Sequence, residues 1–377
     1  MAELRIRIYN VIFGDAILLT IPESDGRTVT MLIDFGNALL KGGDDDALRA
    51  VGENLKRELG NDPLDLYIMT HEHMDHVQGP LLISKKFRIK AREVWMTASS
   101  APDYYERFAN ARKKRLAALD AYDSIAAFAA RTAAPERFQM LLALNNPRAS
   151  RDCVDFIAAI GEKPAHYVHR EAAIDGHHPF VETGIRLLAP EEDTSVYYGR
   201  LRPRTLGVSP NAGGSVETPS DPVVPPAGVA AGDFFDLIEF RATGMSANLR
   251  TIDKAANNSS VAIELEWRGW RLLFPGDAEE KSWEIMDREN LLRPVHFLKI
   301  SHHGSRNGSP LHQIDKVFPA QPHDGRHRVC VVSTSVGAYP GVPDEESLAL
   351  LRSRSTEFHD TRDLAHGKWH DVVFAAP

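Results

Sequence analysis

The sequence predicts an α/β protein in which two β-rich stretches form the two halves of one sandwich. Short apolar or alternating runs, typical of strands, occupy the first ~90 residues and return after about residue 260. Helical spacing is found between them, over about residues 101–161. Histidines and aspartates gather directly behind three of the predicted strands, so we expect these side chains to meet at one edge of the sandwich.

The first β-rich stretch combines strands with one helix. Residues 4–8 alternate apolar and charged side chains, as a half-buried strand does. A Pro/Ser/Asp/Gly turn between two apolar runs predicts a hairpin. The predicted strands are residues 4–8, 16–21, 29–33 and 64–69. Helical spacing over residues 47–59, followed by Gly60, predicts a helix that ends at this glycine.

Residues 100–175 are predicted to form a helical insertion within a single domain that spans residues 1–377. The insertion could cover an active site, form a homo-oligomer interface or dock a protein partner. Its basic run at 112–115 could contact phosphates, but we favour a solvated helix face, because acids flank the run. Residues 203–230 are rich in Pro, Gly and Ser and predict a long loop, or a lid over a cleft.

The second β-rich stretch repeats the strand-and-turn pattern. The predicted strands are residues 260–267, 271–274, 295–300, 328–332 and 371–374. Two helices are expected among them, over residues 278–292 and 344–352.

Composition restricts the function classes. Fifty-two acids against 44 Lys and Arg give a net charge of -8, which argues against a protein that coats nucleic acid nonspecifically. Cys153 and Cys330 form no CxxC pair, so we expect packing roles and a reducing, cytoplasmic location. No signal peptide and no apolar run of membrane-spanning length is seen, so no membrane partner is expected.

The stretch "THEHMDH" follows the predicted strand 64–69. His71 and His73 are two residues apart on an extended segment, so both point the same way and can hold one ion. Asp75 and His76 lie just past the strand, where a turning chain can aim them at a second ion. Imidazole and carboxylate ligands suit zinc, and also manganese or iron.

Further ligand-type residues follow two other predicted strands. Asp277 comes after the strand 271–274 and a Pro-Gly turn, and His302 and His303 come after the strand 295–300. Three strand ends therefore supply candidate metal ligands.

The segments "THEHMDH", "LLFPGDA" and "LKISHHGS", in this order, resemble the signature of the metallo-β-lactamase superfamily. The segments also resemble the hydrolase domain of competence-channel proteins, which import DNA, and its soluble relatives. The resemblance covers roughly residues 5–90 and 180–375. It implies an αββα sandwich with a dinuclear centre on one edge, usually with two zinc ions.

The resemblance also implies a role for each matched residue. His71 and His73 would bind the first metal, and Asp75 and His76 would bind the second, together with one of His302 or His303. Asp277 would bridge both metals. Asp34 would brace the metal loop through hydrogen bonds.

Three positions depart from the family or stay open. Many family members have a further histidine for the first metal; the candidates here are His166, His169, His177 and His178, or this site is completed by water. Val342 stands where relatives carry the histidine of a Gly-His-Pro motif. Residues 257–260 match an Asn/Ser-rich loop that binds substrate or, as we favour, caps a strand.

The resemblance implies a metal-dependent hydrolase in which two metal ions activate a hydroxide. Asp75 and Asp277 would be its catalytic carboxylates, with Asp75 also orienting the hydroxide. Phosphodiesters, in nucleic acid or nucleotide-like molecules, are the favoured substrates. A lactone or carboxylic ester hydrolase is the competing enzyme, because the fold does not fix the substrate. A non-catalytic metal-binding regulatory module is the alternative of another class.

Overall fold

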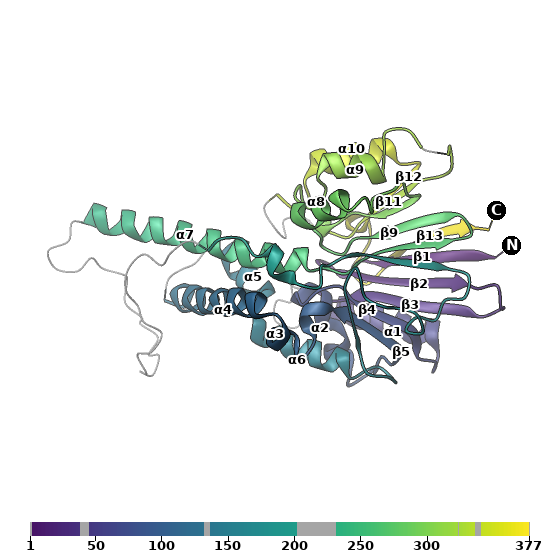
Figure 1. Ribbon diagram of the computed structural model, residues 1–377, viewed down its shortest axis with the longest axis horizontal. Coiled ribbons are helices and arrows are strands. Elements are labelled where there is room, and N and C mark those ends of the chain that lie inside the picture. Colours follow the sequence, from purple (N-terminus) through teal and green to yellow (C-terminus); the bar gives the residue numbers. More distant parts are fainter. Residues whose placement is uncertain are drawn as a thin grey trace.

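In the computed structural model of the protein, two mixed β-sheets lie face to face with helices outside them (Figure 1). The structure describes residues 2–37, 45–131, 136–201, 231–322, 324–335 and 341–376. The predicted Pro/Gly/Ser-rich loop at 203–230 lies outside these ranges. The expected α/β class is confirmed at this level.

The first sheet joins the two ends of the chain. Its strand order is β13-β1-β2-β3-β4-β5-β6. The strands are β1 (Glu3–Tyr9), β2 (Ala16–Pro22), β3 (Thr28–Phe35), β4 (Leu64–Met69), β5 (Ala91–Thr97), β6 (His166–Val168) and β13 (Trp369–Ala375). Strands β1 to β3 are antiparallel, whereas β3 to β6 run parallel, which brings the carboxyl ends of β4, β5 and β6 to one edge.

The second sheet is built mainly from the C-terminal half of the chain, in the order β12-β11-β10-β9-β8-β7. The strands are β7 (Gly184–Ala189), β8 (Ala262–Trp267), β9 (Trp270–Phe274), β10 (Phe297–Lys299), β11 (Val329–Val332) and β12 (Glu357–Asp360). Strands β9 to β12 are parallel, so β9, β10 and β11 also end at a common edge.

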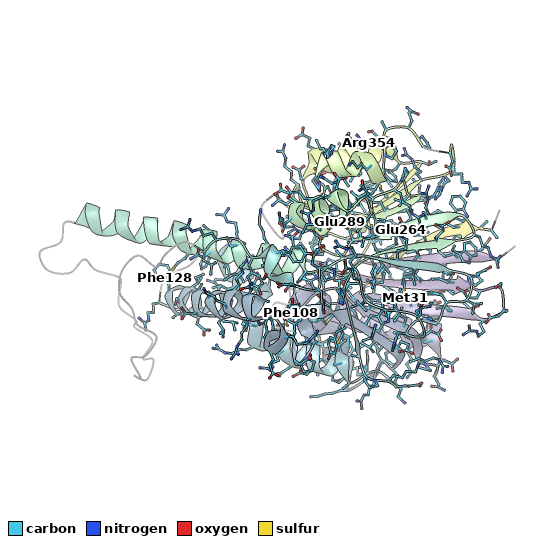
Figure 2. The ribbon with its side chains drawn as sticks, viewed as in Figure 1. Met31, Phe108, Phe128, Glu264, Glu289 and Arg354 are labelled. Carbon is cyan, nitrogen blue, oxygen red and sulfur yellow. The ribbon has the colours of Figure 1, made fainter. Side chains whose placement is uncertain are left out.

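Three buried apolar clusters hold the layers together. The central one lies between the sheets and contains Met31, which Figure 2 labels, together with Trp95 and Phe297. A second cluster packs α1 (Asp46–Leu59), α2 (Met74–Ile83) and α6 (Pro147–Ala158) on the first sheet. A third cluster packs α8 (Glu280–Arg288), α9 (Leu311–Val317) and α10 (Glu345–Arg354) on the second sheet. The order of layers is therefore helix, sheet, sheet, helix.

Further helices project from one end of the sandwich. They are α3 (Tyr104–Arg107), α4 (Ala109–Ala129), α5 (Glu136–Leu144) and α7 (Ala231–Asn258). Helices α4 and α7 lie side by side and share a small apolar cluster that includes Tyr122 and Leu249 (Figure 1). Short 3-10 turns occur at η1 (Ala98–Ser100), η2 (Thr194–Tyr197), η3 (His302–Gly304) and η4 (Thr361–Asp363).

Most elements predicted from alternation or turns are confirmed, including the strand 64–69 and the hairpin of β8 and β9. The helix predicted over 278–292 is shorter, because Asn290 adopts a left-handed backbone conformation (φ 55°) just past its end. Cys153 and Cys330 are buried in the two helix–sheet cores, as expected. Within the described ranges, no helix combines the length and apolarity that a membrane crossing requires.

Candidate metal centre

The histidine cluster occupies the turn between β4 and α2. His71 and His73 follow the strand, and Asp75 and His76 lie in the first turn of α2 rather than in an irregular loop. The turn is pressed against the strands β2 and β3. A Cβ on Gly36 would lie 2.4 Å from the carbonyl carbon of Asp75, so only glycine permits this close approach.

Asp34, near the end of β3, holds this turn in place through hydrogen bonds. Its side chain is fully buried and accepts hydrogen bonds from the backbone N–H of Thr70 (2.7 Å) and from the Thr70 hydroxyl (2.6 Å). Its Oδ2 also lies 2.8 Å from Nδ1 of His76. This contact orients the His76 ring so that Nε2 points toward Asp277, which is the bracing role expected for Asp34.

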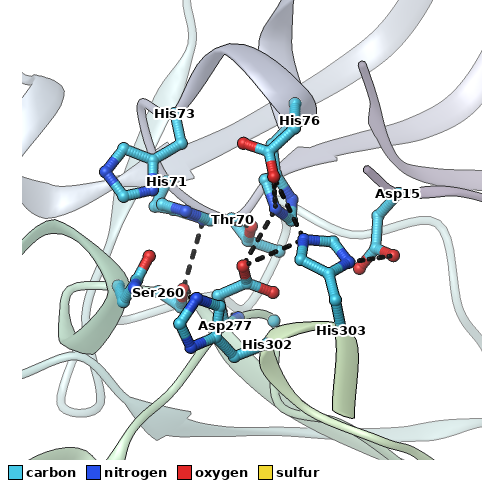
Figure 3. Close-up of polar contacts among 12 residues, drawn as sticks. Asp15, Thr70, His71, His73, His76, Ser260, Asp277, His302 and His303 are labelled. Carbon is cyan, nitrogen blue, oxygen red and sulfur yellow. Dashed lines mark hydrogen bonds and ion pairs between the residues drawn. The ribbon is translucent and has the colours of Figure 1, made fainter. Parts of the chain in front are cut away.

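Four buried side chains from both sheets converge at this edge (Figure 3). They are Asp75, His76, Asp277 and His303, and one ligand atom from each lies within 4.8 Å of the others. Nε2 of His76 is 3.2 Å from Oδ2 of Asp277, and Nε2 of His303 is 3.1 Å from Oδ2 of Asp75. The described residues thus include a buried His/Asp group that could hold a metal ion.

The backbone separates the two adjacent histidines of "SHHGS". His302 and His303 have φ values of 45° and 51°, a left-handed conformation that is rare outside glycine. His303 is fully buried beside Asp277, with Nδ1 hydrogen-bonded to the carbonyl of Ser333 at 2.9 Å. His302 turns instead toward Glu279, with Nδ1 3.2 Å from its Oε1. Of this pair, His303 is the residue that completes the four-residue group.

His71 and His73 lie on the other side of the turn. Their ring centroids are 4.7 Å apart, but neither belongs to a group of three such closely spaced ligand atoms within the described ranges. Nε2 of His73 lies 3.0 Å from Oδ1 of Asn145 and 3.8 Å from Oδ1 of Asp253. Asn145 follows α5 and Asp253 belongs to α7, so helices from outside the sandwich surround this side.

Three buried atoms in the centre have no hydrogen-bond partner. They are Nε2 of His71, Oδ1 of Asp75 and Oδ1 of Asp277. A buried polar atom without a partner costs free energy, on the order of 1–3 kcal/mol, so native proteins seldom leave it unpaired. Imidazole nitrogens and carboxylate oxygens are the donors that zinc and related metals take. The residues present therefore fit a metal ion.

The charge states of these residues depend on one another. Burial lowers the pKa of His303, but Asp277 and Asp75 outweigh this effect and raise it to about 10. Burial alone would raise the pKa of Asp277, yet His303 and His76 hold it well below the usual range. Burial, together with His76 and His73, lowers the pKa of His71 well below 6.5, so its ring is neutral and able to bind a metal.

Several neighbours of the centre carry no sequence signal that marks them in advance. Asp253, Glu279 and His302 form a second group with ligand atoms within 4.8 Å of one another. Behind His303, the buried Lys299 donates to Asp15 at 2.8 Å, and Asp15 also accepts from the hydroxyl of Ser333. Lys299 belongs to the segment "LKISHHGS", but its contact with Asp15 becomes apparent only in the folded structure.

The four histidines considered for the first metal make other contacts. His166 stacks on His177 at 4.1 Å, His178 lies beside Phe180, and His169 is 4.0 Å from Glu192. The described contacts of the first metal's side instead involve Asn145 and Asp253.

Val342 and the Asn/Ser-rich loop do reach the centre. Val342 lines the small cavity over Asp75 and Asp277. Ser260 accepts a hydrogen bond from the backbone N–H of Asp277 at 3.0 Å and lies 3.3 Å from Nδ1 of His71. Asn258 accepts from the N–H of Ser282, in α8. These two loop residues therefore hold neighbouring segments in place.

Comparison with known proteins adds no relative: the chain matches no protein-family model, and no curated protein matches it significantly.

Proposed function

We propose that this chain is a metal-dependent hydrolase of the metallo-β-lactamase superfamily and that its substrates are phosphodiesters. The observation that carries the proposal is the convergence of Asp75, His76, Asp277 and His303, whose ligand atoms lie within 4.8 Å of one another. The three unpaired buried atoms beside them support it further. The helix–sheet–sheet–helix layering is compatible with the αββα sandwich of that superfamily.

Two groups of residues would hold the metal ions. His71 and His73 would bind the first, with Asp253 as an additional donor from α7. Asp75, His76 and His303 would bind the second, and Asp277 would lie between both. Zinc suits this mixture of imidazole and carboxylate, and manganese or iron would also fit. When bound, such ions lower the pKa of water and neutralise charge on the group under attack.

The protein's own residues orient the His76 ring and the attacking water, and exclude bulk water from the site. Asp34 and Thr70 fix the ring of His76, because Asp34 contacts both residues. Oδ1 of Asp75 has no protein partner and would accept a hydrogen bond from the attacking water. Asp277 and His303 are 1% and 0% exposed, so bulk water is largely excluded and electrostatic interactions with the substrate are strengthened.

The choice of phosphodiesters rests on the resemblance of the sequence motifs to those of DNA-import hydrolases and on the charge that develops during the reaction. Attack on phosphorus builds negative charge on the phosphoryl oxygens, which a pair of divalent ions stabilises effectively. The net charge of -8 points to a small or single-stranded substrate at this centre rather than a long duplex bound along the surface.

The test begins with protein purified without chelator. Elemental analysis should find about two metal ions per chain; fewer than about one would support the non-catalytic module. A panel of bis-p-nitrophenyl phosphate, single- and double-stranded nucleic acids, and lactones would follow. Turnover of lactones with no cleavage of any phosphodiester would contradict the proposed substrate class.

A further inference from the structure

A cavity of about 80 Å³ opens beside the candidate metal centre, between the metal turn and helices α4 and α7. One water occupies roughly 10–15 Å³ of such space, so the cavity can take a ring-sized group. His73 and Leu144 line both this cavity and the smaller one above Asp75 and Asp277. The two cavities therefore adjoin each other at these two side chains. We call it the insertion cavity, since α4 lies in the predicted insertion.

One wall of the insertion cavity carries two oppositely charged side chains, Arg115 and Glu72, that are close but not hydrogen-bonded to each other. Nη2 of Arg115 lies 3.6 Å from Oε2 of Glu72, which is too far for a hydrogen bond. Both side chains remain partly exposed, 30% for Arg115 and 23% for Glu72. Each therefore has hydrogen-bonding capacity to spare, with a donor and an acceptor side by side.

Arg115 differs from the rest of its basic run. Residues 112–114 are exposed, as a solvated helix face requires, whereas Arg115 points inward and donates to the hydroxyl of Tyr105 at 3.0 Å. The prediction of a solvated face is thus wrong for this residue. Glu72 likewise points away from the metal turn and accepts from the hydroxyl of Ser100 at 2.8 Å.

The remaining walls suit a flat aromatic ring. Tyr105, Tyr122 and Tyr198 line the cavity, and the Arg115 guanidinium lies 4.8 Å from the ring centre of Tyr105. Ala118 on α4 and Ala255 on α7 supply small apolar surfaces, 5% and 3% exposed. Nucleobases stack on aromatic and guanidinium faces of this kind regardless of sequence.

We propose that the insertion cavity binds the nucleobase of a nucleotide-like phosphodiester whose phosphate lies at the metal centre. The inference rests on the proposed function for the position of the phosphate. Glu72 would accept from a ring or amino N–H, and Arg115 would donate to a ring nitrogen or carbonyl oxygen. An alkyl or acyl chain would cover this ion pair without pairing it, which is unfavourable.

The first test measures binding without catalysis. Chelator-treated protein is titrated with adenosine, guanosine, cytidine and uridine, and heat of binding is recorded by calorimetry. At least one nucleoside should bind with a Kd below about 1 mM. Ala118→Phe, which fills the cavity, should weaken that binding at least tenfold. Ala117→Phe makes the same change at the exposed neighbouring position of α4 and should leave binding unchanged.

Glu72→Gln provides a second variant that keeps the side-chain volume. It should also weaken binding at least tenfold, and it decides the matter if Ala118→Phe does not fold, as judged by its circular dichroism. Equal binding by wild type and Glu72→Gln would overturn the proposed contact. Saturation by octanoyl homoserine lactone, with no nucleoside bound, would assign the cavity to an acyl chain and overturn the inference.

The second test separates this inference from the proposed function. For metal-loaded protein, Ala118→Phe should raise KM for the p-nitrophenyl ester of thymidine monophosphate at least tenfold. KM for methyl p-nitrophenyl phosphate, which has no base, and kcat for both should stay unchanged. Nucleoside binding without any diester cleavage would contradict the hydrolase alone. Diester cleavage without nucleoside binding would contradict the cavity assignment alone.

Discussion

The candidate metal centre has two sides, one around Asp75 and His76 and the other around His71 and His73. Both sides include residues of the same turn, but different parts of the fold supply their other residues. Asp75 and His76 are met by Asp277 and His303, which follow strands of the second sheet and are almost fully buried. His71 and His73, on the preceding residues of the turn, are also buried but belong to no such group of ligand atoms within the described ranges. The side chain of His73 faces Asp253, on α7, across 3.8 Å.

The difference shows which part of the fold determines each side. Parallel strands β9 and β10 end at the same edge as β4, so the sandwich alone brings the Asp75 side together. The His73 side depends on helices that lie outside the sandwich, and these helices also form the insertion cavity. We therefore expect substitutions on the Asp75 side to abolish function and substitutions on the His73 side to modify it.

Asp277→Ala should have the largest effect, because this carboxylate contacts both His76 and His303 and its Oδ1 has no hydrogen-bond partner. We expect loss of both metal ions, by elemental analysis, and a fall in phosphodiesterase activity of at least about 100-fold. Glu280→Ala, which removes an exposed carboxylate three residues later, is the control. Full metal content and full activity in Asp277→Ala would rule out the bridging role.

His303→Ala and His302→Ala form a matched pair of adjacent histidines, of which His303 alone belongs to the Asp75 side. His303 is enclosed by Asp75 and Asp277, whereas His302 contacts Glu279. The first variant should retain at most about one metal ion and lose activity by about 100-fold or more. The second should keep its metal and lose less than about tenfold. Equal losses in the two variants would contradict the separation of these neighbours.

The Asp75 side was largely predictable from the sequence, because an apolar run located β4, a hairpin pattern located β9, and each ligand follows a strand end. The sequence did not predict which of His302 and His303 joins Asp75 and Asp277, because this depends on two left-handed backbone conformations, at φ 45° and 51°. Helix α2 was missed because Gly79 and Pro80 lie within it, and both residues usually interrupt helical patterns.

The His73 side was not predictable. Asp253 is 180 residues from His73 along the chain, and nothing local marks it as a neighbour. Helix α7 was not predicted either; it directly follows residues 203–230, whose Pro/Gly/Ser-rich composition predicts a loop. The contact depends on how α7 packs against α4 and α5, which is tertiary information that neither periodicity nor composition contains.

Asp253→Asn should have an intermediate effect that tests the His73 side directly. The substitution removes a buried carboxylate, 8% exposed, but can keep the hydrogen bond with Asn145. We expect affinity for the weaker of the two metal ions to fall about tenfold, measured by competition with a chelator, while the tighter ion remains. Arg250→Gln, at an exposed position on the same helix, is the control. Loss of both ions would show that the two sides are not independent.

The smallest expected effect concerns pH and the metal-free protein. The carboxylates of Asp277 and Asp75 raise the pKa of His303 to about 10, above the value of about 6.5 in an unfolded chain. Its protonated form therefore stabilises the metal-free fold fully below pH ~6.5, and this contribution is lost as pH rises toward 10. Urea denaturation should show the free energy of unfolding falling by more than about 1 kcal/mol between pH 7 and 9.5. The fall should be smaller in His303→Gln, which has no titrating ring.

The metal-loaded protein should instead become more stable as pH rises over this range. Metal binding must displace the same proton from His303, so higher pH favours metal binding. A parallel pH dependence in both forms would mean that His303 does not exchange a proton for metal.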